Sequence, residues 1–386
     1  MRRHFLLLLG LCMLGPVASG QEFQFNADSA VLSRDMPVLA QEVLGAYKNE
    51  DRKKYLGNAI LLEIAAGQYA RAIQTIHALR DLPGSFMWSN AQYEAYARAK
   101  SLEAANETPL DDAYQQAFRE VFASLTDADS ARAMPLFNVV DESWWKPSFE
   151  AELAAQKGKH TIALADAIAL VRDYQATEIY HAAARLVPAL VEEDDKHRYI
   201  NERDLKVKTP DGATVCALIM RRQKSPAQLP TLLLFTIYAD ITDNLNDARI
   251  TAAHNYAGVV GFTRGKACSP DTPIPYEHDG ADAATLIDWI AAQPWSDGRV
   301  GMYEGSYNGF TQFAAAKHMP KALKALMTGA PAAPGIDVPM EGNVFWNFVY
   351  PWTFYTTDAK YNDDATYNDR KRWEKLDHDW YASGRA

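Results

Sequence analysis

Apolar residues recur at intervals of three and four through residues 24–192, which is the spacing of one buried helix face. The first such segment carries them at Met36, Leu39, Val43, Leu44 and Tyr47. The same spacing predicts further helices over residues 55–66, 69–80, 89–105, 110–124, 147–157, 161–172 and 175–191. No regular period of 34 residues recurs, so we expect an irregular helical domain rather than a repeat array.

The pattern changes after a charged segment at residues 192–196. Short apolar runs then alternate with helical patterns, and Thr231–Ile237 is apolar almost throughout, as in a strand covered on both faces. The predicted strands cover residues 203–208, 213–221, 231–237, 258–262, 300–303 and 322–327, with helices at 244–256, 279–292 and 307–318. This alternation predicts an α/β fold with a doubly wound, mostly parallel sheet. After Pro331 the pattern favours aromatic-rich loops and short helices.

The first twenty residues have the pattern of a secretory signal peptide. Arg2 and Arg3 precede an apolar run over residues 5–14, and the small residues Ala18–Gly20 suit a cleavage site. The run is too short to cross a bilayer, and no later stretch reaches the ~18 apolar residues that a membrane span needs. We therefore expect an exported protein, periplasmic or secreted, with no membrane span after cleavage. The predicted organisation is a signal peptide at 1–20, a helical domain at 21–195, an α/β core at 196–332 and a further region at 333–386.

Composition and charge narrow the possible partners. The 386 residues are 23% charged and 48% hydrophobic, as in ordinary globular proteins. The formal net charge of −10 argues against a general nucleic-acid-binding protein. Cys216 and Cys268 follow the signal peptide, and the sequence leaves open whether they form a disulfide. No phosphate-binding or dinucleotide-binding glycine loop is present, and we interpret Glu277–Asp279 as a helix N-cap rather than as metal ligands. No metal and no cofactor is therefore expected.

Residues 300–309 carry the candidate chemistry. Their sequence, VGMYEGSYNG, predicts a strand, a tight turn with Ser306 at its tip and the start of a helix, which is the layout of a nucleophile elbow. Gly305 and Gly309 flank the serine, as expected where the backbone is strained and the following helix packs closely. The serine hydroxyl would stand beside a helix N-terminus, which favours negative charge. Ser306 is therefore the candidate nucleophile.

Several further blocks accompany this elbow in a fixed order. They are Thr236-Ile-Tyr238, Arg264-Gly265, Tyr276-Glu-His-Asp-Gly280, Trp289-Ile-Ala-Ala-Gln-Pro-Trp295 and Ser296-Asp-Gly-Arg-Val-Gly301. With them the sequence resembles the α/β-hydrolases of the X-prolyl dipeptidyl-peptidase, cocaine esterase and α-amino acid ester hydrolase group, over roughly residues 200–386. The resemblance implies an α/β-hydrolase core with the start of a cap at 333–386. The helical domain lies outside it.

The resemblance also implies roles for individual residues. Ser306 would accept the acyl group, and the backbone N–H of Tyr307 and the hydroxyl of Tyr238 would form the oxyanion hole. Two fixed donors in a dry site stabilise the charge of a tetrahedral intermediate better than water does. Some members of the group bind an α-amino group through acidic residues after the sixth strand. Asp337 and Glu341 lie in such a segment here, although loop-capping acids are the preferred interpretation.

The sequence departs from the family pattern at two points. Glu304 stands two residues before the nucleophile, where the family usually has glycine. It would crowd the elbow, tune the site or bind a substrate ammonium, and we interpret it as a tolerated replacement. The second departure is the general base, which in this fold follows the serine as Asp or Glu and then His. His318 lies at the far end of the elbow helix and His378 in a segment that resembles the cap, so we expect the acid and base beyond Ala386.

We therefore predict a serine hydrolase that cleaves esters or amides of small molecules or short peptides through an acyl-enzyme. A peptidase acting on X-Pro peptides is a variant of this hypothesis, because the leaving group is selected by the cap and its pocket. The alternative is a non-catalytic binding protein on a hydrolase scaffold, which the missing base and Glu304 would suit. The sequence makes no prediction of oligomeric state.

Overall fold

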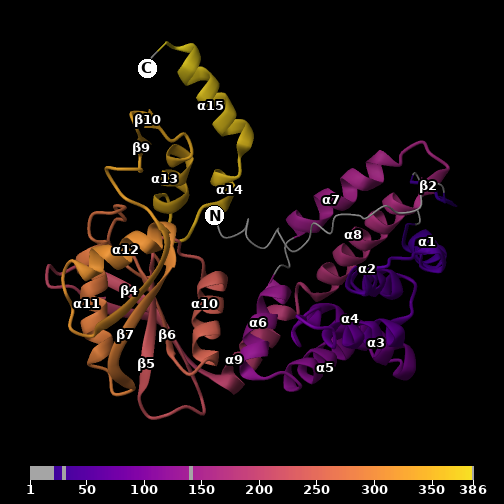
Figure 1. The fold of residues 1–386 in the computed structure, drawn as a ribbon, viewed down its shortest axis with the longest axis horizontal. Helices are drawn as coiled ribbons and strands as arrows, with labels where there is room; N and C mark the ends of the chain where they lie inside the picture. Colours follow the sequence, from indigo (N-terminus) through magenta and orange to yellow (C-terminus); the bar gives the residue numbers. More distant parts are fainter. Residues whose placement is uncertain (1–20, 28–31, 139–141, 385–386) are drawn as a thin grey trace. The chain divides into compact units, whose positions relative to one another are not determined.

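The structure is a computed structural model that describes residues 21–27, 32–138 and 142–384. The described chain forms two compact units, one that ends at Asp194 and one that begins at Asp195. Both units can be followed in Figure 1. The predicted signal peptide at residues 1–20 lies outside the described residues. Among the described residues, no helix is both long and apolar enough to cross a membrane.

Helices make up most of the first unit, because their apolar faces pack against one another. Buried residues such as Tyr114, Phe118 and Phe122 form one of its clusters, and their spacing of four residues is the helical repeat seen in the sequence. Consecutive helices pack as pairs, including α2 with α3, α4 with α5 and α7 with α8. The helices are α1 (Leu32–Ala46), α2 (Arg52–Ala65), α3 (Tyr69–Arg80), α4 (Ala91–Asn106), α5 (Leu110–Ala123), α6 (Asp127–Asn138), α7 (Glu142–Ala155), α8 (Leu164–Ala183) and α9 (Val187–Arg198).

The first unit differs from the sequence prediction in four details. A two-stranded antiparallel sheet joins β1 (Glu22–Gln24) to β2 (Thr161–Ala163), and it pairs the buried residues Phe23 and Ile162. Helix α8 runs without a break through residues 173–174, where two helices were predicted, and α6 was not predicted. The charged segment 192–196 is part of α9 rather than a break between elements. Pairing between segments so far apart in the chain leaves no local sequence signal.

The second unit is built on a six-stranded sheet in the order β3-β4-β6-β5-β7-β8. β3 and β4 form an antiparallel hairpin, β4 is also antiparallel to β6, and the remaining neighbours are parallel. This is the mostly parallel, doubly wound sheet predicted for the α/β-hydrolase class. Its strands are β3 (Tyr199–Lys208), β4 (Thr214–Arg222), β5 (Leu229–Thr236), β6 (Ala257–Phe262), β7 (Ser296–Gly305) and β8 (Leu323–Pro331).

Both faces of the sheet are covered, which explains the continuous apolar runs. Helix α10 (Ile241–Ala253) lies on one face, and α11 (Asp279–Ala291) and α12 (Ser306–Ala316) lie on the other (Figure 1). Alternate residues of a strand point to opposite faces. In β4, accordingly, Leu218 packs in the cluster with α10, whereas Ala217 and Ile219 pack in the cluster with α11.

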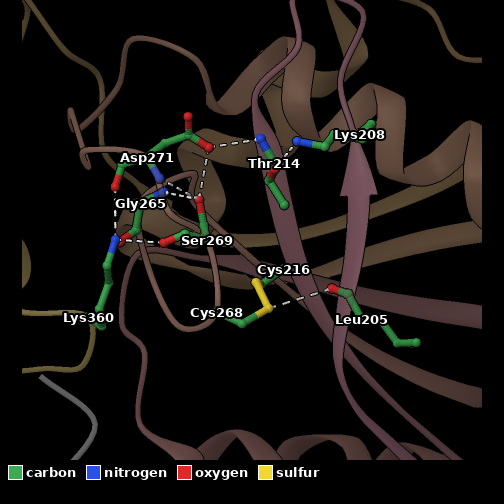
Figure 2. The surroundings of a disulfide bond; sticks show 9 residues. All are labelled: Leu205, Lys208, Thr214, Cys216, Gly265, Cys268, Ser269, Asp271 and Lys360. Carbon is green, nitrogen blue, oxygen red and sulfur yellow. Dashed lines mark hydrogen bonds between the residues drawn. A yellow bond between two sulfur atoms is a disulfide. The ribbon is translucent and has the colours of Figure 1, made fainter.

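A disulfide between Cys216 and Cys268 links β4 to the loop that follows β6, with the two Cα atoms 5.7 Å apart (Figure 2). The sequence left this pairing open. Within the same loop, the hydroxyl of Ser269 accepts a hydrogen bond from the backbone N–H of Gly265 at 2.7 Å. The carboxylate of Asp271 accepts one from the backbone N–H of Thr214 at 2.9 Å, so the loop is tied to the sheet at two points.

The segment after the sheet is attached to this loop by two lysines, which we call the lysine clasp. The ammonium group of Lys360 donates to the carbonyl oxygens of Gly265, Ser269 and Asp271 at 2.6–2.9 Å (Figure 2). Lys266 reaches in the opposite direction to the carbonyl oxygens of Thr356 and Ala359, each at 2.7 Å. Burial, and then the charge of Lys360, lower the pKa of Lys266 to about 8. The segment contains β9 (Met340–Glu341), β10 (Val344–Phe345), α13 (Val349–Thr357), α14 (Asp364–Tyr367) and α15 (Arg370–Ala382).

Candidate active site

Ser306 lies at a strained turn between β7 and α12. The strand ends at Gly305, the helix begins at Ser306, and the serine has a φ of 53°. Non-glycine residues rarely adopt this left-handed conformation, so a serine held there marks a constrained site. The carbonyl oxygen of Ser306 accepts a hydrogen bond from the backbone N–H of Ala332 at 2.9 Å. The turn therefore lies at the carboxyl end of the sheet, where active sites of open α/β sheets form.

Close backbone packing accounts for the two glycines around the serine. A Cβ atom at Gly305 would lie 2.2 Å from the carbonyl oxygen of Gly329 on the neighbouring strand. A Cβ atom at Gly309 would lie 2.9 Å from the Cα atom of Pro331. Both distances are shorter than a carbon contact allows, so larger residues would push the elbow away from β8.

Tyr238 follows β5 and brings its hydroxyl to the serine. Its side chain hydrogen-bonds with that of Ser306, and its hydroxyl oxygen accepts a hydrogen bond from the indole N–H of Trp352 at 3.1 Å. Burial raises the pKa of Tyr238 to about 12, so its hydroxyl stays protonated near neutral pH. The structure thus places a neutral hydroxyl beside Ser306, as an oxyanion-hole donor requires. Trp352 is 114 residues away in the chain and carries no motif, so local sequence gives no sign of this contact.

Tyr307 is held by a carboxylate beneath the elbow. Its buried hydroxyl donates to Asp279 at 2.7 Å and accepts a hydrogen bond from the backbone N–H of Tyr276 at 3.0 Å. Asp279 also accepts a hydrogen bond from the hydroxyl of Thr263 at 2.5 Å. Burial raises the pKa of Asp279 to about 6, although both hydroxyl donors act in the opposite direction. These contacts fix the residue whose backbone N–H is the predicted second oxyanion donor.

The N-cap interpretation of Glu277–Asp279 is wrong for the side chains. Helix α11 does begin at Asp279, but its N-cap residue, His278, makes no capping hydrogen bond. The carboxylate of Asp279 instead turns inward to Tyr307. Local sequence cannot distinguish these two uses of an aspartate at a helix start.

Among the described residues, no group of three or more His, Cys, Asp or Glu side chains is arranged to hold a metal ion.

An aromatic cluster adjoins Ser306. Tyr307 lies within 6.0 Å of four other rings, measured between ring centroids. Tyr276 is the nearest of these at 4.7 Å. Rings from the sheet end, the α11 loop, α12 and α13 therefore form one cluster next to the nucleophile. Its members are Tyr238, Tyr276, Tyr307, Phe310, Trp352 and Tyr355.

Glu304 occupies a backbone position that suits glycine. Its φ is 96°, in the region that L-residues rarely adopt. Its carboxylate accepts a hydrogen bond from the side-chain amide of Asn308 at 3.2 Å, across the elbow on the first turn of α12. The amide of Gln312 donates to the Glu304 carbonyl oxygen at 2.7 Å. The replacement is thus accommodated by α12, at the cost of backbone strain.

The two candidate acids after the sixth strand have different surroundings. Asp337 accepts a hydrogen bond from the backbone N–H of Ala333 at 2.7 Å, which is a loop-capping contact. Together with burial and other nearby charges, its charge raises the pKa of Tyr276, so Asp337 lies near the aromatic cluster. Glu341 is exposed on the short strand β9, opposite Val344. Ser306, Tyr238 and Tyr307 lie together, whereas Asp337 and Glu341 lie in the loop and hairpin that follow β8.

Two histidines follow Ser306 in the sequence, and neither is placed as its base. His318 lies just beyond the end of α12, and the rise of a helix puts it about 18 Å from the elbow. His378 lies on α15 with its side chain 80% exposed, 3.6 Å from Asp379. Proton transfer needs contact at hydrogen-bond distance.

Comparison with known proteins supports this description of the second unit. Residues 211–385 match the X-Pro dipeptidyl-peptidase (S15) family. The cocaine esterase of Rhodococcus sp. (strain MB1 Bresler) is 34% identical over 134 residues, which are 33% of this chain and 22% of that protein. These matches confirm the predicted resemblance of this part of the chain to the X-Pro dipeptidyl-peptidase and cocaine esterase group, a group of hydrolases.

Solved structures match parts of the chain as well. A CocE/NonD family hydrolase from Staphylococcus aureus is 25% identical, with a TM-score of 0.30 over 33% of this chain and 27% of that one. An α-amino acid ester hydrolase is 22% identical, with a TM-score of 0.37 over 43% of this chain and 31% of that one. The chain therefore spans less than a third of the length of each of these relatives.

Proposed function

We propose that Ser306 is the acyl-accepting nucleophile of a serine hydrolase that cleaves ester or amide bonds. The observation that carries this proposal is the strained serine at the elbow, with the neutral hydroxyl of Tyr238 hydrogen-bonded to its side chain. Family membership of residues 211–385 supports the same reaction class.

In the proposed reaction the Oγ atom of Ser306 attacks the substrate carbonyl and loses its proton to a general base. The carbonyl oxygen becomes an oxyanion that accepts hydrogen bonds from the backbone N–H of Tyr307 and the hydroxyl of Tyr238. Collapse of the tetrahedral intermediate expels the alcohol or amine and leaves an acyl-enzyme, which water then hydrolyses. The general base of this step is proposed as a histidine held by an orienting acid.

The substrate is proposed as a small ester or amide, or a short peptide. The aromatic cluster beside Ser306 would favour an apolar or aromatic group next to the reacting carbonyl. The relatives are named as an esterase and an α-amino acid ester hydrolase, and the matched family as X-Pro dipeptidyl-peptidases; all three activities suit this cluster. Asp337, near the aromatic cluster, and Glu304 are the candidates to bind a substrate ammonium group.

We also propose that the protein is exported. The charged and apolar pattern of residues 1–20 is typical of a signal peptide. The disulfide between Cys216 and Cys268 supports an oxidising compartment, since such bonds are rare in the cytosol.

The test is active-site labelling of the full-length natural protein with a fluorophosphonate probe. We expect one labelled serine in the native protein and no label in Ser306→Ala. Ser383→Ala, at the exposed end of α15, is the matched control and should label normally. Rates on an alanyl-prolyl anilide and on a phenylglycine ester would then separate a peptidase from an esterase. Absence of both labelling and turnover in a folded protein would instead favour the non-catalytic binding protein.

A further inference from the structure

The indole of Trp352 makes a hydrogen bond that reaches from the cap to the oxyanion hole. Its Nε1 atom lies 3.1 Å from the hydroxyl oxygen of Tyr238, and the two residues are 114 positions apart in the chain. Trp352 is on α13, which follows the sheet, whereas Tyr238 is at the end of β5.

The direction of this hydrogen bond is fixed by the chemistry of the two groups. An indole N–H only donates, so the hydroxyl oxygen of Tyr238 must accept. A phenol has a single proton, and that proton is then left to point to another acceptor. The Ser306 side chain is in hydrogen-bond contact with Tyr238, and its hydroxyl oxygen is able to accept this proton in the resting site. A phenol that accepts one hydrogen bond is also a stronger donor of its own proton.

Packing holds the indole in the orientation that this hydrogen bond needs. The Trp352 side chain is only 8% exposed. Its ring lies 5.9 Å from Tyr307, 6.0 Å from Tyr276 and 6.5 Å from Tyr238, measured between centroids. Three tyrosines of the elbow region therefore surround one tryptophan of α13, and a rotation of the indole would break these contacts.

We propose that Trp352 is a positioning residue that directs the Tyr238 hydroxyl proton at the oxyanion. This inference rests on the proposed function. Trp352 contacts no reacting atom in this assignment and acts only through Tyr238. Its consequence is that α13, a cap element, sets the orientation of an oxyanion-hole donor that belongs to the core.

A double-mutant cycle in the full-length natural protein tests the proposal. Trp352→Phe removes the N–H and keeps an aromatic ring, and we expect kcat to fall about threefold to tenfold with little change in KM, as for loss of one neutral hydrogen bond. Tyr238→Phe should lower kcat by about 10²–10³-fold. If Trp352 acts through Tyr238, adding Trp352→Phe to Tyr238→Phe lowers kcat no further.

The matched control is Trp373→Phe, which removes an indole N–H that donates to the carbonyl oxygen of Thr366, at 2.8 Å, on the same cap segment. It should leave kcat unchanged. Replacement of Trp352 by benzothienylalanine, which exchanges the N–H for sulfur in a ring of the same shape, gives a second variant if Trp352→Phe unfolds. It should reproduce the loss of kcat.

The outcomes separate this proposal from the one on which it rests. If Ser306→Ala retains turnover, the proposed nucleophile is wrong. Suppose instead that Ser306→Ala is inactive, but that Trp352→Phe lowers kcat by the same factor whether residue 238 is tyrosine or phenylalanine. The tryptophan is then only structural, and the positioning role is overturned. Unchanged kcat in the benzothienylalanine variant overturns it as well.

Discussion

The hydroxyl of Tyr307 donates to the carboxylate of Asp279 over 2.7 Å, beneath the elbow that carries Ser306. Asp279 is fully buried and the described contacts provide hydroxyl and backbone donors for it, not a cation. Burial therefore dominates, and it raises the pKa of this carboxyl group to about 6 from 3.8. The tyrosine next to the nucleophile is thus held by an acid that changes charge in weakly acidic solution.

This relationship predicts a pH-dependent stability. Between pH 4 and 6 the folded protein holds the Asp279 proton more tightly than the unfolded chain, so the free energy of unfolding falls as pH rises through that window. The shift corresponds to about 3 kcal/mol. The free energy of unfolding of Asp279→Asn, minus that of the native protein, should therefore rise by up to about 3 kcal/mol from pH 4 to pH 7. Urea denaturation at each pH measures this difference. The control is Asp288→Asn, an exposed acid on the same helix, whose difference from the native protein should stay flat.

The elbow glycines predict a second, steric effect. Gly305→Ala would place a Cβ atom 2.2 Å from the Gly329 carbonyl oxygen, so the strand must move. We expect a loss of about 1–3 kcal/mol in the free energy of unfolding. Gly329→Ala lies directly opposite on β8 and has open space, so it should have little effect. Equal losses in the two variants would show that close packing is not the reason for glycine at 305.

Glu304 predicts a stabilising substitution. Its φ of 96° costs about 1–3 kcal/mol for a residue with a Cβ atom, while glycine adds about 0.5–1 kcal/mol of chain entropy. Glu304→Gly should therefore raise the free energy of unfolding by about 1 kcal/mol. Glu304→Ala also removes the carboxylate but keeps the strain, and it should not be stabilised. Comparing the thermal and urea unfolding of the two variants distinguishes the effect of backbone strain from the effect of the carboxylate charge.

The disulfide predicts sensitivity to reductant. Cys216 and Cys268 are 52 residues apart, and opening a loop of that size by Cys216→Ser should cost about 2–4 kcal/mol. The Cys216→Ser/Cys268→Ser double variant should cost no more than either single variant, because one bond is removed in each case. Dithiothreitol should lower the free energy of unfolding of the native protein and leave that of the cysteine variants unchanged. A native protein whose unfolding is indifferent to reductant would contradict the pairing.

Local patterns in the sequence determined most of the helices and strands and the position of the candidate nucleophile. The strands of the sheet follow from apolar runs because both faces are covered, as Leu218 and Ile219 show by packing in opposite layers. The Ser306 turn also follows from sequence, since a nucleophile between close-packed glycines is a local arrangement.

Only the tertiary structure decided which distant side chains meet. Four contacts join residues that are far apart in the chain and share no local period. They are the hydrogen bonds of Trp352 with Tyr238 and of Tyr307 with Asp279, the disulfide between Cys216 and Cys268, and the lysine clasp. Strand β2 was predicted as a helix for the same reason, because its pairing with β1 spans more than 130 residues. Contacts of this kind depend on strand order and on the path of the loops, and neither of these is encoded in the spacing of neighbouring residues.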